Sequence, residues 1–284
     1  MREVEGNERA AYRSLFAAGQ AVHGPRCFEV ADLGEAALFM SPLVRQPGVF
    51  NRVLGFGLDA SADLRDLARM EAAFASRGLG MGLEASPAQL SPAVSARLRE
   101  LGLRRGAMSA MLIRRHGWGA GAFDAPAAWR PERGGTGRLR AVQADSAGQR
   151  AMVAAICARV FAVGDAIGRV LEALPAAGGW QHWLAYLDEE PAGAALSHVA
   201  DGRCWLGWAA TLREFRSLGV KGALDDLRLA HAAASGCRLV SSDTAVGTTA
   251  SPDHSLKSLR RRGFEVLYQR ATYLRLAPLH APHA

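Results

Sequence analysis

The stretch of sequence that decides the fold spans residues 204–236 and reads CWLGWAATLREFRSLGVKGALDDLRLAHAAASG. Its pattern predicts a buried strand over 204–211, then a turn that is basic and contains glycine, and then a helix over 220–234. We call residues 216–222 the basic turn; they are Arg216, Ser217, Leu218, Gly219, Val220, Lys221 and Gly222.

The basic turn has the properties of a phosphate site. The first backbone N–H groups of a helix have no acceptor within the helix, and the helix dipole adds partial positive charge there. Gly219 allows the backbone to approach a ligand closely. We therefore expect the amides from Ser217 to Gly222 to surround a pyrophosphate, with help from the side chains of Arg216 and Lys221. From the residues alone, the alternative is an ordinary loop before an amphipathic helix.

Strand and helix patterns continue on both sides of this stretch. In the second half we expect further strands over 139–143, 183–187, 192–199, 238–242, 264–268 and 271–276, and helices over 146–161, 166–174 and 255–262. In the first half we expect one or two strands within 27–40, strands over 49–58, 80–84 and 107–114, and helices over 8–22, 61–76 and 91–101. The order predicts an α/β (α+β) chain in which helices flank a mixed central sheet in each half.

The two halves end alike, which indicates a duplicated fold. The matching positions are a leucine, a glycine and a strand end, which are Leu98, Gly102 and Arg114 in the first half and Leu259, Gly263 and Arg275 in the second. Residues 116–137 lie between the halves and are rich in Gly, Pro and small residues, as linkers are. We therefore predict two domains, over residues 1–133 and 134–284.

Composition restricts the partners that we expect. The 284 residues carry a formal net charge of +7, but the basic residues are spread along the chain, so we expect no nucleic-acid partner. The four cysteines form no CxxC pair, which favours reduced thiols in a cytoplasmic protein. We find no secretory signal and no run of about 20 apolar residues, so we expect no membrane association. HExxH, GxSxG and the Walker lysine are missing, and we expect no metal.

The order strand, basic turn, helix, strand, helix and glycine resembles the core of the GNAT family of acyl-CoA N-acyltransferases. The resemblance covers residues 139–276. The family's turn is Gln or Arg, two residues, Gly, one residue, and then Gly or Ala. Here Arg216 and Gly219 fit, whereas Lys221 occupies the last position and Gly222 follows it. The resemblance implies that the second half binds acetyl-CoA.

The resemblance also implies how the rest of the coenzyme is held. In the family, two parallel strands splay apart and the pantetheine arm forms strand-like hydrogen bonds in the gap. Ala209, Ala210 and Thr211 would supply that edge here, although a strand packed tightly against a helix would look the same. The first half resembles the same fold, but Asp59 and Asp63 stand in place of its basic turn and would repel a phosphate. We therefore expect the first half to bind no CoA and to shape the substrate cleft or brace the second half.

Catalytic residues are less clearly marked. Amine acylation needs a base, a donor for the oxyanion and an acid for the leaving thiolate. The resemblance implies a backbone N–H near Ala209 or Ala210 as the oxyanion donor. It implies a Tyr as the acid at the position of Leu259, where this chain has none. The candidates that remain are a residue after the strand 238–242 and two strand tyrosines, namely Asp243, Tyr268 and Tyr273.

Each candidate has a structural alternative. Asp243 could cap a turn, and the two tyrosines could be core residues. Further polar or aromatic residues have similar alternatives. His254 could be a solvated loop residue, and Glu189 and Glu190 could be hairpin-turn residues. The cover over the sheet could be formed by Trp180, His182 and Trp183. Ser255 is expected to cap the helix that follows it.

We therefore expect a cytoplasmic N-acetyltransferase that moves an acetyl group from acetyl-CoA to a small-molecule amine. Whether the protein forms a homodimer is left open. The missing Tyr motivates the alternative of a CoA-binding regulatory or scaffold protein without turnover. A basic nucleic-acid binder is the weaker third alternative.

Overall fold

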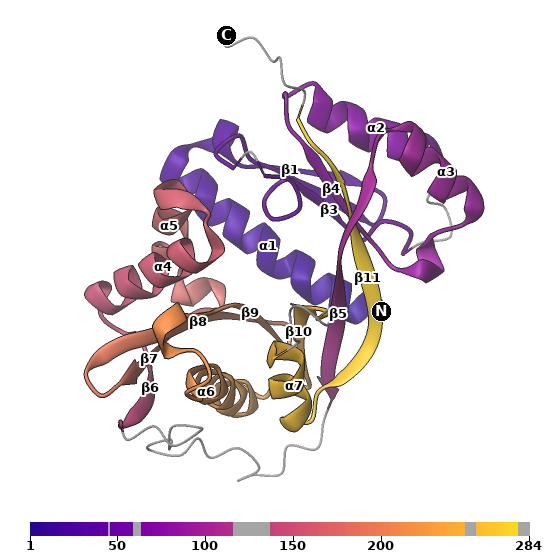
Figure 1. Cartoon of the computed structure of the whole chain (residues 1–284). Coiled ribbons are helices and arrows are strands. Elements are labelled where there is room, and N and C mark those ends of the chain that lie inside the picture. The colour runs from indigo at the N-terminus through magenta and orange to yellow at the C-terminus, as the bar shows by residue number, and fades with distance from the viewer. Residues whose placement is uncertain (45, 59–63, 116–136, 248–253, 278–284) are drawn as a thin grey trace. The chain divides into compact units, whose positions relative to one another are not determined.

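The structure is a computed structural model that describes residues 1–44, 46–58, 64–115, 137–247 and 254–277. The chain forms two compact units: unit 1 contains Met1–Met111 and Val266–Ala284, and unit 2 contains Leu112–Glu265. Strand β5 (Arg104–Arg115) therefore begins in unit 1 and ends in unit 2, and β11 (Glu265–Arg275) does the reverse (Figure 1). The predicted domain boundary at residues 133 and 134 lies outside the described residues and stays a prediction. The last strand, however, belongs to unit 1, although we had assigned it to the second domain.

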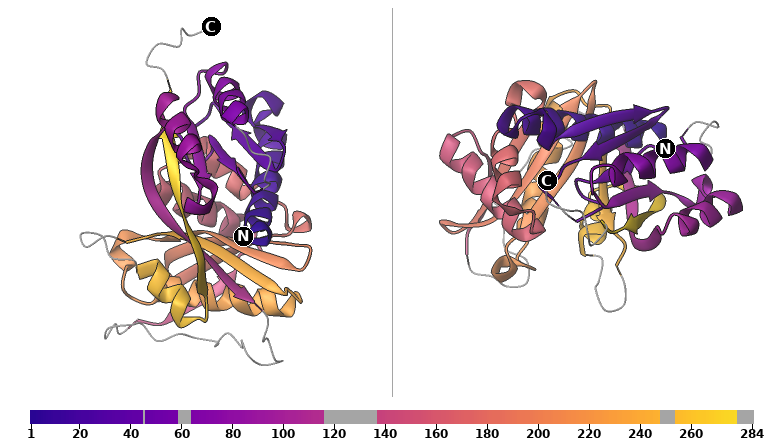
Figure 2. Two further views of the ribbon diagram at one scale, coloured as in Figure 1. Left: turned by 90° about the vertical axis from the view of Figure 1, so that its right-hand side faces the viewer. Right: turned by 90° about the horizontal axis from the view of Figure 1, so that it is seen from above.

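Unit 1 is built on a mixed sheet. Its remaining strands and its helices are α1 (Arg2–His23), β1 (Glu29–Leu33), β2 (Ala36–Met40), β3 (Arg52–Leu54), α2 (Leu64–Ala75), β4 (Met81–Ala85) and α3 (Pro92–Glu100). The strand order is β1-β2-β3-β4-β11-β5; β3 and β4 are parallel, and β11 is antiparallel to β4. Figure 2 shows the first part of β5 beside β11.

The unit 1 sheet carries a core on each face. Leu38 and Met40 belong to one core together with the buried side chains of α2, which are Leu67, Met70 and Phe74. Phe39 lies between them in the sequence and points to the opposite face, where its ring lies 5.1 Å from that of Phe16 on α1. This alternation is the period of two that a strand imposes.

Unit 2 has the strand order β5-β10-β9-β8-β7-β6. Its further elements are β6 (Leu139–Gln143), α4 (Ala147–Phe161), α5 (Gly164–Glu172), β7 (Trp180–Leu187), β8 (Glu190–Ala200), β9 (Arg203–Thr211), α6 (Val220–Ala234), β10 (Leu239–Ala245) and α7 (His254–Arg261). Strands β6 to β9 are antiparallel neighbours, and β10 is parallel to β9. Helices α4 and α5 cover one face of this sheet, and α6 and α7 lie on the other (Figure 1).

Most expected elements are present close to their expected bounds, but two expectations were wrong. The strands expected over 264–268 and 271–276 are one continuous strand, β11, which pairs with β4 in unit 1. The strand expected over 49–58 is only Arg52–Leu54. It ends because Gly55 and Gly57 take positive φ angles of 82° and 68°, which a β-strand does not accommodate. Within the described ranges, we find no helix with the length and apolar character needed to cross a membrane.

The resemblance between the ends of the two halves is also structural. Helix α3 is followed by Gly102 with φ 75°, and α7 is followed by Gly263 with φ 77°. The residue after each glycine donates its N–H to the leucine five residues earlier, at 2.8 Å for Leu98 and 3.2 Å for Leu259. Both helices therefore end in the same glycine cap.

Candidate functional site

The basic turn in unit 2 has the backbone conformation that an anion site requires. Ser217 has φ 65° and Gly219 has φ 86°, so two residues of the turn are left-handed. Gly219 is the N-cap of α6, and its carbonyl accepts from the Ala223 N–H at 3.0 Å. The amides of the first turn of α6 then have no acceptor within the helix. A concave set of such amides is a common way to hold a phosphate.

The neighbouring strands separate next to this turn. Strands β9 and β10 are paired from Arg203 with Leu239 as far as Leu206 with Ser242, and both continue beyond that pair without further pairing to each other in the described chain. We call this point the strand fork. The Ser242 hydroxyl donates to the Leu206 carbonyl at 2.9 Å and fixes the last paired position. The fork leaves one edge of the end of β9, including Ala209, Ala210 and Thr211, open to an extended ligand.

Strand β9 also contains a bulge just beyond the fork. Two residues, Trp208 and Ala209, lie opposite the single residue Ala195 of β8. Trp208 has φ 52°, a value that a bulky side chain rarely adopts. A bulge takes one residue out of the hydrogen-bonding ladder and redirects its backbone groups. The backbone N–H that we expected to act near Ala209 therefore lies in a segment that leaves the regular ladder.

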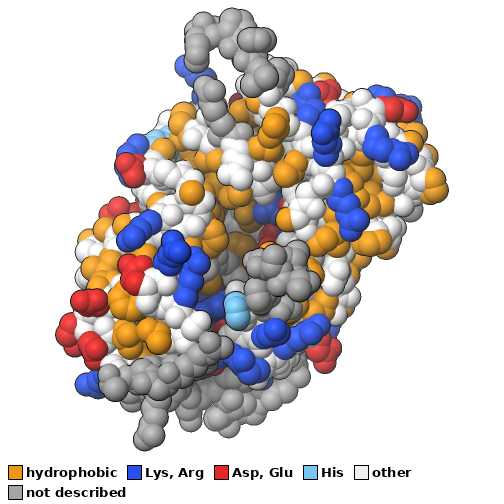
Figure 3. Space-filling model, in the orientation of Figure 1, with side chains coloured by type: hydrophobic (Ala, Val, Ile, Leu, Met, Phe, Trp, Pro, Cys, Tyr) orange, Lys and Arg blue, Asp and Glu red, His pale blue; other side chains and the backbone are white. Residues whose placement is uncertain are grey.

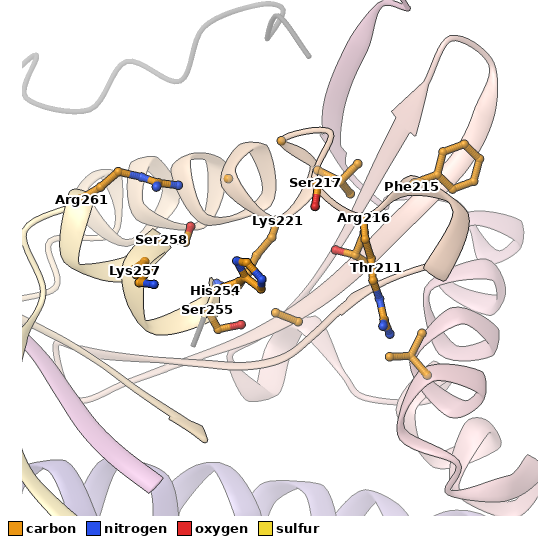
Figure 4. A pocket seen from close by; sticks show the side chains of 15 residues that line it. Thr211, Phe215, Arg216, Ser217, Lys221, His254, Ser255, Lys257, Ser258 and Arg261 are labelled. Atoms are coloured by element: carbon orange, nitrogen blue, oxygen red, sulfur yellow. The ribbon is translucent and has the colours of Figure 1, made fainter. Parts of the chain in front are cut away.

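The basic turn, the end of β9 and helix α7 line one pocket of about 600 Å³ (Figure 4). Eight of the ten residues predicted for the coenzyme line it, namely Ala209, Thr211, Arg216, Ser217, Gly219, Val220, Lys221 and Gly222. Leu218 does not line the pocket, and Ala210 is buried on the other side of the strand. Among the described residues that line the pocket, none is Asp or Glu, whereas Arg216, Lys221, His254, Lys257 and Arg261 are basic.

Lys221 does not contribute an isolated charge. Its Nζ lies 2.6 Å from Oδ2 of Asp225, one helical turn further along α6. Asp225 is fully buried and also contacts Arg228 and the hydroxyl of Ser258. Burial alone would raise the pKa of Asp225, but the charges of Lys221, Arg228 and Arg262 outweigh burial and lower it. The carboxylate is therefore ionised, and it neutralises part of the charge that we had assigned to Lys221.

The bulge is held from both faces of the sheet, on one of them by Arg228 of this network. Arg228 Nη1 donates to the carbonyls of Leu196 at 3.2 Å and Gly207 at 3.1 Å, which form the strand pair next to the bulge. From the α4 side, the Cys157 thiol donates to the Trp208 carbonyl at 3.4 Å. Burial raises the pKa of Cys157 to about 12, so it remains a thiol donor at neutral pH.

Helix α7 contributes residues that we had not predicted as part of this site. It begins at His254, so Ser255 is inside the helix and does not cap it, and the preceding residues 248–253 lie outside the described residues. His254, Lys257, Ser258 and Arg261 share a face, and they line the pocket. Leu256 and Leu259 are buried on the other face. The spacing of three, four and seven residues could have identified this face in the sequence.

The three predicted catalytic residues fall in different places. Asp243 follows the last residue of β10 that pairs with β9 and therefore lies at the strand fork. Tyr268 belongs to unit 1, where its hydroxyl donates to the carboxylate of Glu5. Burial raises the pKa of Tyr268, and the negative charge of Glu5 raises it further. Tyr273 also belongs to unit 1 and packs against the core that contains α2. Neither tyrosine lines the pocket.

The position of the expected acid is a core position. Leu259 is 2% exposed and packs into the interior of unit 2. The other residues considered from the sequence are structural: Trp180, His182 and Trp183 are buried, and Glu189 is an exposed hairpin residue that pairs with Arg140. His182 Nε2 lies 2.8 Å from the Leu171 carbonyl, and Trp183 donates to Ser197 at 2.8 Å.

Unit 1 is closed at the place that corresponds to the strand fork. Gln89 donates its amide N–H to the carbonyl of Phe56, beyond the end of β3, and its Oε1 accepts from Ser86 N, beyond the end of β4, at 2.7 Å. One side chain thus joins the ends of the two parallel strands. Asp59 and Asp63, on which we based the expectation of no CoA in this half, lie outside the described residues. The part of the chain that the structure describes contains no group of three or more His, Cys, Asp or Glu side chains arranged to hold a metal ion.

Comparisons with known proteins agree with this geometry. Residues 132–242 match the family described as acetyltransferase (GNAT) domain. No curated protein matches the sequence significantly. Among solved structures, a GCN5-related N-acetyltransferase from Kribbella flavida is similar with a TM-score of 0.61 and 17% identity, over 92% of this chain and 95% of that one. One from Sphaerobacter thermophilus has a TM-score of 0.61 and 16% identity, over 96% and 93%.

A third similar structure has two GNAT folds in one chain. It is a tandem GNAT protein from the clavulanic acid biosynthesis pathway, with a TM-score of 0.58 and 15% identity over 94% of this chain and 89% of that one. At these identities the structural likeness shows the fold, and the family match covers the region of the basic turn and the strand fork. This chain therefore contains a GNAT acetyltransferase domain over residues 132–242, and its two units have GNAT-like folds.

Proposed function

We propose that this protein is an acyl-CoA-dependent N-acetyltransferase that uses the pocket of unit 2 to transfer the acetyl group of acetyl-CoA to a small-molecule amine. The observation that carries this proposal is the strand fork, which opens directly beside the basic turn. The turn suits the pyrophosphate because its amides and Arg216 favour an anion. The open edge of β9 suits the amide groups of the pantetheine arm, because a strand edge offers regularly spaced N–H and C=O groups.

The bulge of β9 supports the transfer step. Attack of an amine on a thioester builds negative charge on the carbonyl oxygen, and a fixed backbone N–H stabilises that charge. The N–H of Ala209 is the candidate donor, since it belongs to the bulge that Arg228 and Cys157 hold in place. A donor that is already oriented requires no rearrangement when the charge develops.

Asp243 is the candidate base. A carboxylate at the strand fork would lie near the carbonyl carbon and could accept the proton of the incoming amine, directly or through water. No residue takes the role of the family's Tyr at the Leu259 position, and Ser258 beside it donates its hydroxyl to Asp225 at 3.2 Å. Protonation of the leaving thiolate therefore falls to solvent or to another residue of the pocket.

A charge placed in the basic turn tests the coenzyme site. Gly219→Asp puts a carboxylate where the phosphate is proposed to bind, and Gly219→Asn is the matched control because it has the same shape and tolerance of the left-handed region without the charge. We expect Asp to weaken acetyl-CoA binding at least about tenfold more than Asn does, because like charges repel strongly near a protein surface. Isothermal titration calorimetry measures both. Equal affinities of the two variants would count against the basic turn as the phosphate site.

A CoA-binding protein without turnover is the second candidate, because the acid position is occupied by the buried Leu259. Release of free thiol from acetyl-CoA across a panel of amines separates the two. Thiol release that depends on an amine supports the enzyme, and binding without release supports the regulatory or scaffold protein. We further propose a cytoplasmic location, in which Cys27, Cys157, Cys204 and Cys237 stay reduced; all four are described and free of disulfides.

A further inference from the structure

The last turns of α4 hold Trp208 at two points. Its carbonyl accepts a hydrogen bond from the Cys157 thiol at 3.4 Å. Its ring lies edge to face with the ring of Phe161, and the two centroids are 5.1 Å apart. Cys157 has no exposed surface, whereas Val160, three residues further along α4, lines the pocket. Cys157 therefore contacts the bulge of β9 from the interior, close to the pocket.

The carbonyl of Trp208 and the N–H of Ala209 belong to one peptide group. A peptide group is planar, and in the trans form its C=O and N–H bonds point in opposite directions. None of the described peptide bonds is cis. The Trp208 carbonyl points toward Cys157, on the face of the sheet that α4 covers (Figure 1). The Ala209 N–H must therefore point toward the opposite face, which α6 and α7 cover.

This opposite face is the one on which the basic turn and α7 line the pocket. Figure 3 shows Lys and Arg side chains on the surface over α7. In a regular strand, the C=O and N–H groups lie in the plane of the sheet and pair with neighbouring strands. In the bulge, the Ala209 N–H is instead directed to the side on which the coenzyme is proposed to bind, and the thiol that directs it lies on the other side of the sheet.

We propose that Cys157 is a positioning residue for acyl transfer: given the proposed function, its thiol fixes the peptide between Trp208 and Ala209 so that the Ala209 N–H faces the thioester carbonyl. No bond to Cys157 forms or breaks during the reaction. The thiol bonds to the carbonyl end of the peptide whose N–H end stabilises the oxyanion, and hydrogen bonds linked in this way polarise one another. Because burial raises the pKa of the Cys157 thiol to about 12, the group stays a donor near neutral pH.

Matched cysteine variants test the proposal. Cys157→Ala removes the donor, and Cys157→Ser restores a hydroxyl donor of similar size. Cys204→Ala is the control, because Cys204 is a second fully buried thiol of unit 2 and lies on the regularly paired part of β9.

Three measurements compare the four proteins. Infrared difference spectroscopy of bound acetyl-CoA, isotope-labelled at the acetyl carbonyl, reports the hydrogen bond to that carbonyl and needs no acceptor. Release of free thiol with the amine that reacts fastest in the panel gives kcat. Isothermal titration calorimetry gives the Kd for acetyl-CoA.

We expect Cys157→Ala to move the carbonyl band to higher frequency. It should also lower kcat by about tenfold or more, since loss of one oxyanion donor costs about 100-fold to 1,000-fold and here the donor is misdirected rather than removed. The Kd should change by less than about threefold, because the N–H bonds more weakly to the neutral carbonyl than to the oxyanion. Cys157→Ser should restore the band and kcat, and Cys204→Ala should leave both unchanged.

Equal effects of the two alanine variants on kcat, or a serine variant that behaves like Cys157→Ala, would overturn the role assigned to the thiol. A carbonyl band at the same frequency in all four proteins would overturn the direction assigned to the Ala209 N–H. If the unaltered protein binds acetyl-CoA but releases no thiol with any amine, the proposed function fails instead, because the band measures the donor without turnover.

Discussion

Asp225 is the residue that connects the basic turn with the bulge of β9. Its carboxylate contacts Lys221 in the first turn of α6 and Arg228 one turn further on, and Arg228 holds the carbonyl of Gly207 at 3.1 Å. The carboxylate has no exposed surface. A buried carboxylate between several cations is costly to remove, because the cations then remain buried without compensation.

Asp225→Asn should therefore destabilise the protein by about 3–5 kcal/mol, as loss of one partner of a buried ion pair does. Asp226→Asn is the matched control. Its carboxylate is 26% exposed and contacts Arg262, so we expect a loss of about 1 kcal/mol or less. Unfolding in guanidinium chloride, followed by circular dichroism, measures both. Equal losses would mean that burial of Asp225 adds nothing beyond a surface pair.

The pH dependence of stability provides a second readout for Asp225. The folded protein lowers the pKa of this carboxyl below its ordinary value of 3.8, so ionised Asp225 stabilises the fold at pH values above that. The contribution is lost as the pH falls through the lowered value. We expect the stability difference between the unaltered protein and Asp225→Asn to be constant from pH 8 to pH 5 and to shrink below about pH 4. A difference that grows on acidification would contradict this assignment.

At the scale of elements, β11 places a charged cluster inside unit 1. Arg270 lies 3.2 Å from Glu5, 2.7 Å from Glu8 and 3.3 Å from Glu84, and it is 1% exposed. Arg52 adds contacts to Glu8 and Glu84, at 3.1 and 3.2 Å. The strand thus joins α1, β3 and β4 by charge as well as by its hydrogen bonds to β4.

Arg270→Ala should lower the stability of the protein by about 3–5 kcal/mol, because Glu8 and Glu84 would then share Arg52 and Glu5 would lose the cation that it contacts. Arg275→Ala is the control on the same strand. Arg275 lies 2.8 Å from Glu71, and each of the two side chains is about one-fifth exposed. We therefore expect a loss of stability of about 1 kcal/mol or less. Thermal unfolding by differential scanning calorimetry compares the two. The role assigned to the cluster fails if Arg275→Ala costs as much as Arg270→Ala.

This strand also shows where sequence patterns stop being informative. Gln269 and Arg270 interrupt the apolar pattern between Tyr268 and Ala271, and two short strands were therefore expected. The interruption is a buried cluster whose partners lie more than 180 residues away in the sequence. Local periodicity cannot indicate partners at that separation, nor that the strand pairs with β4 in unit 1. Helix α6, by contrast, was predicted at its observed bounds, since its amphipathic pattern and the preceding Gly219 are local signals.

Like the fold, the candidate site was predictable only where the signal in the sequence is local. The basic turn could be located because glycine and basic residues at a helix start have a direct physical meaning. The bulge could not, since nothing about Trp208 in the sequence predicts φ 52°. The α7 face could have been found from the spacing of Lys257 and Arg261.

At the scale of the whole molecule, we predict that the two GNAT-like units differ in whether they can bind the coenzyme. Unit 2 opens at the strand fork, whereas Gln89 joins the ends of β3 and β4 in unit 1 by hydrogen bonds to Phe56 and Ser86. An extended ligand would have to break both of these part-buried hydrogen bonds to enter unit 1, and a typical hydrogen bond contributes about 0.5–1.5 kcal/mol.

We therefore expect one molecule of acetyl-CoA to bind per chain. Calorimetric titration gives this stoichiometry directly, and Gly219→Asp should remove the binding heat while the circular dichroism spectrum stays unchanged. Gln89→Ala removes both hydrogen bonds in unit 1 and should leave the affinity of the unit 2 site as it is. Two sites per chain, or residual binding of one equivalent in Gly219→Asp, would place a coenzyme in unit 1 and contradict the closed fork described for it.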